Sequence, residues 1–438
     1  MTGPRKPDLY PHQRAELAFL LDTPRALLLS ETGTGKTPVL LAYAEDCLRQ
    51  GLTVLWVTEK GLVGQVMREA AVWLNDGTPS PVAFDKAKAT DRFRVATHGL
   101  LARRAGKLNA FGADLLIVDE AQIVGGGGIE PNAATYRAIR ELSEASTRSV
   151  FATATPVGTA HAFDLLALLE CAQIPGCPSR AVMASQAEYQ TATTKWGTAQ
   201  VLAGITDYGL DLLIAALARH AIRTTVKDTG QAMPALVQRF IDVPLTGEDA
   251  QAYAEAGAMV GLRGHHYRQS ASRSPDALVP ALVHNMAVAD SRGHRHVVVF
   301  TDNFDLFDPI TETLRSCGRD VQTITGKDTP AQRTAALRAH AEAPASVLVG
   351  TGAVETGLNI QHASLLVSVV QSWNPAREEQ REGRLIRLGS PHREVTHLVI
   401  RPAVGIEAHK VNRHDRKRDI AERVLGAVGS TAGERGAA

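Results

Sequence analysis

Short apolar runs alternate with longer segments of helical periodicity along most of this 438-residue chain. Strands buried on both faces of a parallel sheet produce such runs, and apolar residues three and four positions apart mark the helices between them. In the first half, the runs that predict strands are Ala26–Leu29, Thr53–Thr58, Arg94–Thr97, Leu115–Val118 and Ser149–Ala152. This alternation predicts βα units and a mainly parallel sheet.

A second series of strand-like runs follows in the other half of the chain. Its members are Val237–Val243, Val297–Thr301, Val321–Ile324, Ser346–Val349, Leu365–Val370 and Thr396–Ile400. The chain therefore reads as two α/β halves of similar size, joined between Ala221 and Pro234. The expected domains are residues 1–225 and residues 226–425.

Three segments depart from the alternation. Residues 178–222 are rich in Ala, Thr and Gln and predict a small helical insertion, and residues 247–290 predict a second one. A basic loop, Arg263–Arg273, interrupts the second insertion. Residues 426–438 are small and polar, which predicts a disordered tail.

Composition narrows the class of protein. With 44% hydrophobic and 21% charged residues, the chain is globular, and its net charge of +1 requires any nucleic-acid surface to be local. Its 4 cysteines lack metal-ligand spacing and suit a reducing compartment. The first residues lack the apolar core of a signal peptide, and no apolar run approaches the ~20 residues of a membrane span. We therefore expect a soluble, cytoplasmic protein without a membrane partner.

The stretch SETGTGKT, residues 30–37, follows the first apolar run and precedes a helical segment. Strand, glycine-rich turn and helix in this order are the context of a phosphate-binding loop. The loop residues expected around the phosphates of a nucleoside triphosphate are Glu31, Thr32, Gly33, Thr34, Gly35, Lys36 and Thr37. Lys36 would reach the β- and γ-phosphates and Thr37 would ligate Mg²⁺. Ser30 stands where the pattern has its first glycine, and an ordinary glycine-rich turn is the alternative.

Asp119 and Glu120 follow another apolar run, so both carboxylates would emerge at the carboxyl edge of the sheet, beside that loop. We assign Asp119 to the metal ion and Glu120 to the water that attacks the γ-phosphate. A solvated acidic strand end is the alternative.

In the second half, QREGRLIR places Arg384 and Arg387 three residues apart. On a helix these positions share a face, where two guanidinium groups could meet the phosphates of a nucleotide. In isolation, an exposed cationic helix face would be the simpler explanation.

Together these motifs resemble helicase superfamily two, and within it the Swi/Snf-type DNA translocases. The resemblance extends from Leu9 to about Leu425 and implies two tandem RecA-like lobes that bind ATP and Mg²⁺. Gln13 resembles the glutamine that recognises adenine. Residues Asp119–Gln122 resemble the second motif of the family, which more often has His at the position of Gln122. Thr153–Pro156 resembles the third motif, which links hydrolysis to DNA contact, and Ala221–Thr224 resembles the linker between the lobes. Thr356–Ile360, with Gly357 in the nucleotide site, resembles the fifth motif, and Ser372–Pro375 resembles a hallmark of the Swi/Snf branch. Gly405–Glu407 with Lys417 resembles the C-terminal brace of that branch. In the sixth motif, Arg384 and Arg387 resemble the two arginine fingers.

The resemblance also implies a path for duplex DNA, with single-stranded DNA as an open alternative. Its expected contacts are Lys60, Thr97, Thr301, Asp302, Thr351, Asn359 and Trp373. Such groups touch phosphates and would give little sequence preference. The cationic residues between 410 and 418 are better explained as a solvated helix face than as phosphate contacts.

The resemblance predicts a monomeric, DNA-dependent ATPase that moves along duplex DNA. Three alternatives stay open at this point. The chain could be a strand-separating helicase, the motor of a nuclease or restriction assembly with a separate nuclease or recombination/repair partner, or a nucleotide-gated scaffold without turnover.

Overall fold

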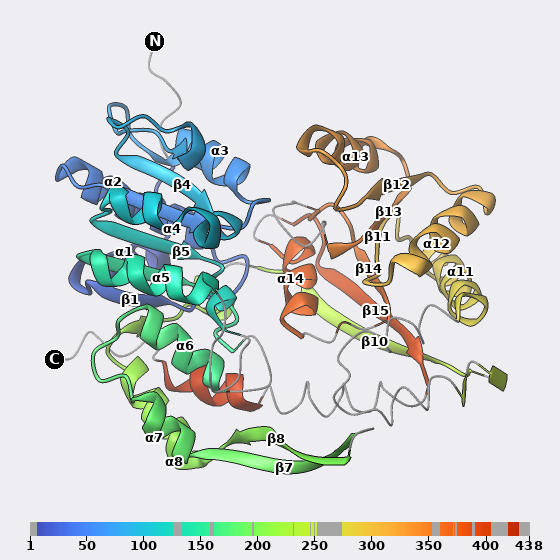
Figure 1. Cartoon of the computed structure of the whole chain (residues 1–438). Coiled ribbons are helices and arrows are strands. Elements are labelled where there is room, and N and C mark those ends of the chain that lie inside the picture. The colour runs from blue at the N-terminus through green and yellow to red at the C-terminus, as the bar shows by residue number, and fades with distance from the viewer. Residues whose placement is uncertain are drawn as a thin grey trace. The chain divides into compact units, whose positions relative to one another are not determined.

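The computed structural model describes residues 7–125, 134–157, 162–194, 197–230, 232–245, 247–248, 250–251, 274–352, 360–370, 372, 375–387, 390–403 and 419–428. The chain divides into two compact units (Figure 1). Unit one comprises residues 1–190, 202–231 and 416–438, and unit two comprises residues 191–201 and 232–415.

Unit one is built on a parallel sheet with the strand order β3-β4-β2-β5-β6-β1-β9. Its strands are β1 (Arg25–Leu28), β2 (Val54–Thr58), β3 (Val82–Ala83), β4 (Phe93–Thr97), β5 (Leu115–Asp119), β6 (Arg148–Ala152) and β9 (Ala221–Ile222). Its helices are α1 (Pro11–Asp22), α2 (Lys36–Arg49), α3 (Val63–Trp73), α4 (His98–Phe111), α5 (Ala134–Ala145), α6 (Phe163–Cys171), α7 (Arg180–Ser185) and α8 (Asp207–Leu217), with short 3₁₀ helices η1 (Phe84–Lys86), η2 (Ala121–Val124) and η3 (Lys227–Thr229).

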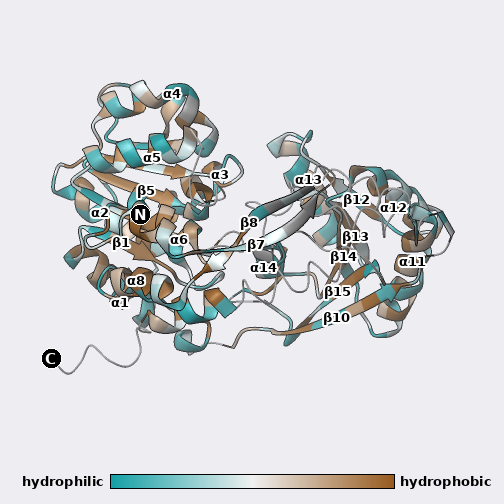
Figure 2. Ribbon diagram, turned by 60° about the horizontal axis from the view of Figure 1, so that its bottom comes forward, coloured by the Kyte–Doolittle hydropathy of each residue, from teal (hydrophilic) through white to brown (hydrophobic). Residues whose placement is uncertain are grey.

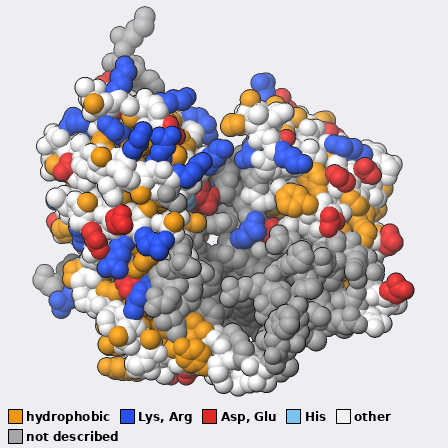
Figure 3. Space-filling view, viewed as in Figure 1, with side chains coloured by type: hydrophobic (Ala, Val, Ile, Leu, Met, Phe, Trp, Pro, Cys, Tyr) orange, Lys and Arg blue, Asp and Glu red, His pale blue; other side chains and the backbone are white. Residues whose placement is uncertain are grey.

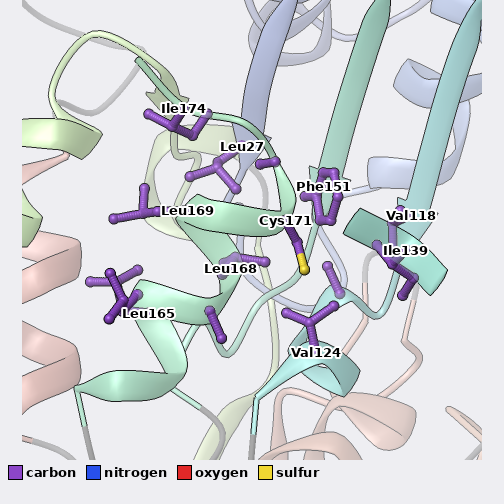
Figure 4. Packing of buried hydrophobic residues seen from close by; sticks show 14 of the residues in the cluster. Leu27, Val118, Val124, Ile139, Phe151, Leu165, Leu168, Leu169, Cys171 and Ile174 are labelled. Atoms are coloured by element: carbon purple, nitrogen blue, oxygen red, sulfur yellow. The ribbon is translucent and has the colours of Figure 1, made fainter. Parts of the chain in front are cut away.

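Successive residues of each central strand point to opposite faces of this sheet, and both faces are buried. Leu27 and Phe151 belong to one apolar cluster, whereas their neighbours Leu28 and Val150 belong to the other. The first cluster packs against α4, α5, α6 and α8, and the second against α1, α2 and α3. Figure 4 shows α6 laid on the first face, and Figure 2 shows the apolar strands in brown.

Unit two repeats this plan with the strand order β10-β15-β14-β11-β13-β12, again all parallel. Its strands are β10 (Ala235–Val243), β11 (His296–Phe300), β12 (Val321–Ile324), β13 (Ser346–Gly350), β14 (Leu365–Val369) and β15 (Glu394–Pro402). Its helices are α11 (Pro275–Ser291), α12 (Phe304–Ser316), α13 (Pro330–Glu342) and α14 (Pro375–Leu385). The expected architecture of two tandem RecA-like α/β lobes is confirmed.

Two expectations about the insertions and the tail need correction. Residues 178–222 form helices α7 and α8 only at the two ends, and between them lie the paired strands β7 (Ala187–Thr194) and β8 (Gly197–Ile205). Residues 419–427 form a helix whose Val424 packs into the core of unit one, as does Val428. The end of the described chain therefore belongs to unit one, and Val428 is part of a packed core, not of a disordered tail.

The second expected insertion, residues 247–290, contains α11, but residues 252–273, including the basic loop, lie outside the described residues. Among the helices in the described ranges, none is both long and apolar enough to cross a membrane.

Candidate nucleotide site

The loop between β1 and α2 has the backbone of an anion cradle. Gly33 and Gly35 have φ of 88° and 87°, a left-handed conformation that favours glycine. Gly35 is also the N-cap of α2, so the loop N–H groups and the positive end of the helix lie together. The glycines of the predicted phosphate loop thus occupy the positions that require them.

Helix α1 holds this loop from one side. His12 contacts the carbonyl of Thr34 through Nε2 at 3.0 Å, and Gln13 Nε2 donates to the carbonyl of Gly35 at 3.1 Å. A Cβ on Gly35 would lie 2.4 Å from Gln13 Nε2, so glycine also permits this close approach. Gln13, predicted to read adenine, therefore lies directly on the loop.

Lys36 lies at the start of α2 and turns back over the loop. Its Nζ donates to the carbonyls of Ser30 at 2.9 Å and Glu31 at 3.2 Å. The Thr34 hydroxyl donates to the same Glu31 carbonyl at 2.9 Å, which tightens the turn. A flexible ammonium group in this place can exchange carbonyl oxygens for phosphate oxygens.

Ser30, the departure from the usual glycine, is fully buried and has a specific role. Its hydroxyl donates to Glu16 Oε1 and accepts the backbone N–H of Thr224 at 3.0 Å. The Thr224 hydroxyl donates to the same Glu16 oxygen at 2.5 Å. Serine therefore supplies a hydrogen bond that glycine could not make.

Asp119 and Glu120 lie where β5 ends, as expected. Burial, and secondarily the charge of Glu120, raise the pKa of Asp119 to about 7, while Lys36 acts in the opposite direction. Glu120 has a φ of 52°, which is uncommon for a residue with a Cβ and turns the chain sharply after the strand. Lys36 acts on the pKa of Asp119, and the loop after β1 and the acidic end of β5 lie at the carboxyl edge of one parallel sheet, so both can serve one site.

Gln122 joins this acidic end to the next strand. Its Nε2 donates to Glu120 Oε2 at 2.9 Å, and its Oε1 accepts the hydroxyl of Thr153 at 2.6 Å. Thr153 in turn accepts the N–H of Thr155 at 3.0 Å. Glutamine thus carries a continuous hydrogen-bonded chain from Glu120 to the segment after β6.

The side chains available for a metal ion are hard oxygen donors. Asp119 offers a carboxylate, which the Thr58 hydroxyl contacts at 3.3 Å, and Thr37 offers a hydroxyl next to Lys36. Mg²⁺ prefers such oxygens and usually binds through one or two protein groups plus substrate phosphates and water. The residues present therefore fit the predicted ion.

In unit two, the predicted fingers lie at the end of α14. Arg384 is buried on the helix, whereas Arg387 follows the last helical residue, Leu385, and its Nε donates to the carbonyl of Gly383 at 3.0 Å. The expectation that both share one helix face therefore needs correction, because the helix ends between them.

The buried ion network beside them was not predicted. Arg381 is fully buried; its guanidinium donates to Glu378 at 3.0 Å and to Asp302 at 2.7 Å, and lies over the ring of Phe300. Glu378 also accepts from the N–H of Ser372 and the hydroxyl of Ser368. Burial raises the pKa of Glu378, but these partners and His397 outweigh it and hold the pKa at about 2. The sequence QREGRLIR did not indicate which of its arginines has a structural role.

The residues expected to touch DNA divide into three groups. Lys60 is exposed after β2, and Thr97 is half-buried at the start of α4. Thr301 and Thr351 are buried, the Thr301 hydroxyl is bonded to Asn303 within its own turn, and Asp302 pairs with Arg381. Contact of these three residues with DNA stays a prediction. Asn359 and Trp373, with Gly357 and the brace residues Gly405–Glu407 and Lys417, lie outside the described residues.

Comparison with known families places both units. Residues 10–163 match the DEAD/DEAH box helicase family, and residues 278–389 match the helicase conserved C-terminal domain. The chain is a superfamily-two helicase ATPase. It is thus an ATP-hydrolysing motor with both conserved helicase domains, as its motifs predicted.

Among solved structures, this helicase is similar to the Sulfolobus solfataricus SWI2/SNF2 ATPase core in complex with dsDNA. The two chains are 17% identical, and the match covers 96% of this chain and 94% of the other with a TM-score of 0.45.

Proposed function

We propose that this helicase is a Swi/Snf-type translocase that uses Mg²⁺-ATP to move along duplex DNA with little sequence preference. The observation that carries the proposal is the hydrogen-bonded chain Glu120–Gln122–Thr153 at the sheet edge that also holds Lys36. It links the group placed to activate water with a segment that resembles the DNA-coupling motif of this branch.

Each residue of the site has a task in this reaction. Lys36 leaves the carbonyls of Ser30 and Glu31 for the β- and γ-phosphates, and the loop N–H groups of residues 33–37 surround them. Glu120, oriented by Gln122, accepts a proton from the attacking water. Mg²⁺, held by Thr37 and Asp119, would neutralise charge on the phosphates. Arg384 and Arg387 would stabilise the charge that develops in the transition state.

Duplex DNA as the track is supported by motif resemblance and by local charge. Unit one has a set of exposed cations around α3, β4 and α4, and Figure 3 shows Lys and Arg side chains gathered on that part. Its members are Lys60, Arg68, Lys86, Lys88, Arg103, Arg104 and Lys107. Exposed lysines and arginines bind backbone phosphates without reading bases, which suits a motor that must pass over any sequence.

The test is the ATPase rate of the full chain with duplex DNA, single-stranded DNA and RNA measured side by side. We expect the largest stimulation with duplex DNA, displacement of a triplex-forming strand, and no unwinding of a forked duplex. Equal stimulation by RNA, or unwinding without triplex displacement, would contradict the duplex-translocase proposal.

Two substitutions test the site itself. Lys36→Ala and Arg387→Ala should each lower kcat at least about 100-fold, because each removes a positive charge that stabilises the transition state. The affinity for DNA should stay within a few-fold of the wild-type value. Arg140→Ala, on the exposed face of α5, is the matched control and should keep full activity. Full turnover in Arg387→Ala would remove the finger assignment.

A further inference from the structure

Strands β1 and β9 end side by side, and each continues into a functional segment. They pair in parallel with Leu28 opposite Ile222, so two residues further along Ser30 comes opposite Thr224. Ser30 opens the phosphate loop, and Thr224 opens the segment that leads through η3 to β10, the first strand of unit two's sheet. The sheet register therefore brings the nucleotide loop against the start of the interdomain linker.

Buried polar contacts join the two segments on the inner side. Glu16, on α1, is fully buried and accepts hydroxyl hydrogen bonds from both Ser30 and Thr224 through one oxygen, Oε1. The backbone N–H of Thr224 donates to the Ser30 hydroxyl, which closes a triangle of three residues. Each residue is bonded to the other two, so a shift of the loop at Ser30 reaches Thr224 directly.

Charged contacts join the same segments on the outer side. The carboxylate of Glu31 accepts from the Arg223 guanidinium at 2.9 Å and from the N–H of Val226 at 2.8 Å. The Glu31 N–H donates to the carbonyl of Thr224 at 2.9 Å. Arg223 also donates to the carbonyl of Leu425 at 3.4 Å, in the helix of residues 419–427. We call the set Glu16, Ser30, Glu31, Arg223, Thr224 and Val226 the linker joint.

The same two loop residues also hold the catalytic lysine. Lys36 Nζ bonds the carbonyls of Ser30 and Glu31, whose side chains hold the linker. Phosphates that draw the ammonium group away must change the bonding of both residues. Ser30 and Glu31 thus contact Lys36 through their backbone carbonyls and the linker through their side chains.

We propose that Glu16 and Arg223 are positioning residues of the ATPase, and that the linker joint transmits phosphate occupancy of the loop to residues 223–235. This inference rests on the proposed function, because it assumes that ATP binds the loop. The coupling runs through a contiguous set of contacts with a defined alternative state, Lys36 on phosphate in place of Lys36 on carbonyl.

Hydrogen exchange of the full chain, with and without a non-hydrolysable ATP analogue and Mg²⁺, tests the coupling. In the wild type, nucleotide should change exchange in peptides that cover residues 222–230, where the Val226 N–H bonds Glu31. Arg223→Gln should abolish that change while the affinity for the analogue stays within about 3-fold. Arg423→Gln, which removes a surface arginine paired with Asp207, is the matched control and should respond like the wild type.

Steady-state kinetics separate positioning from simple structural support. Arg223→Gln should lower DNA-stimulated kcat about 5-fold or more with little change in the KM for ATP, because coupling and not uniform binding is lost. Arg223→Lys, which keeps a charge opposite Glu31, should recover part of kcat. Melting curves close to that of the wild type should accompany both variants.

The outcomes distinguish this inference from the proposed function. Normal hydrolysis by the wild type without any nucleotide-dependent exchange change at residues 222–230 would overturn the linker joint alone. Unchanged DNA-stimulated kcat in Arg223→Gln would do the same. Failure of the wild-type chain to bind or hydrolyse ATP would overturn the proposed function and, with it, this inference.

Discussion

Each unit buries a glutamate next to its functional segment, and the surroundings shift the pKa values of the two in opposite directions. Glu16 of unit one accepts two hydroxyl hydrogen bonds on one oxygen, and its Oε2 has no hydrogen-bond partner among the described residues. Burial raises its pKa, more than Ser30, Thr224, His12 and Lys36 lower it. Glu378 of unit two has donors on both oxygens and a buried arginine beside it, and its pKa is about 2.

The difference shows that depth of burial does not decide the state of a carboxyl group. Both side chains are almost wholly inaccessible to water, which disfavours charge in both. Only Glu378 has a full positive charge within hydrogen-bonding distance to compensate. Unit two therefore fixes α14 with a buried ion network, whereas unit one holds its loop with neutral hydroxyl groups.

The largest loss of stability should come from Glu378→Gln. The amide leaves the buried Arg381 guanidinium with Asp302 as its remaining carboxylate partner, and breaking a buried pair in this way costs about 3–5 kcal/mol. Hydrogen exchange in increasing urea should show the loss in peptides from β14 and α14. As a control, Arg338→Ala breaks an exposed pair with Glu342 in the same unit and should leave that exchange unchanged. A loss below about 1 kcal/mol would mean that the network is not the support of α14.

A smaller effect should follow from Ser30→Gly, although it restores the usual residue of the phosphate loop. Glycine removes the hydroxyl that bonds Glu16 and Thr224, so buried polar groups lose partners at a cost of about 1–3 kcal/mol. Urea unfolding followed by exchange in β1 and α2 measures it. Ser146→Gly, in the same unit, is the comparison that removes a buried hydroxyl far from the loop in sequence. Equal or greater stability of Ser30→Gly would show that the serine is only tolerated.

The smallest effect should come from Glu16→Gln, with a pH trend opposite to that of Glu378→Gln. A raised folded pKa gives a contribution that is complete below the unfolded pKa and lost as pH rises through the folded one. The free energy of unfolding of Glu16→Gln, relative to that of the wild type, should therefore increase as pH rises above about 4.5. The change should be under about 1 kcal/mol. For Glu378, whose pKa is lowered, the stabilisation is present above about pH 4.5 and is lost as pH falls toward 2, so its variant should differ most at the higher pH. Parallel trends in the two variants would contradict the contrast.

Much of the fold was predictable because its signals are local. Apolar runs such as Leu115–Val118 became strands, and SETGTGKT became the turn between β1 and α2. Asp119 and Glu120 follow from the rule that parallel strands end at one edge. These inferences need only neighbours in sequence and the geometry of a parallel sheet.

What the sequence did not reveal depends on partners far apart in the chain. Glu16 has no local pattern, because its partners Ser30 and Thr224 meet it only once β1 and β9 pair. Strand β7 is polar and threonine-rich, so it lacks the apolar alternation that marks a strand. The helix of residues 419–427 is short, and its destination in unit one is set by tertiary packing alone.

That returning helix has a consequence for how the protein is made. Val424 and Val428 complete a core whose other members, such as Leu27 and Leu165, are translated before the whole of unit two's sheet. At about 5–20 residues per second, a ribosome exposes the rest of unit one for some tens of seconds before this cover is synthesised. During that interval the apolar surface beneath the helix faces water, and we expect it to be where chaperones engage the nascent chain.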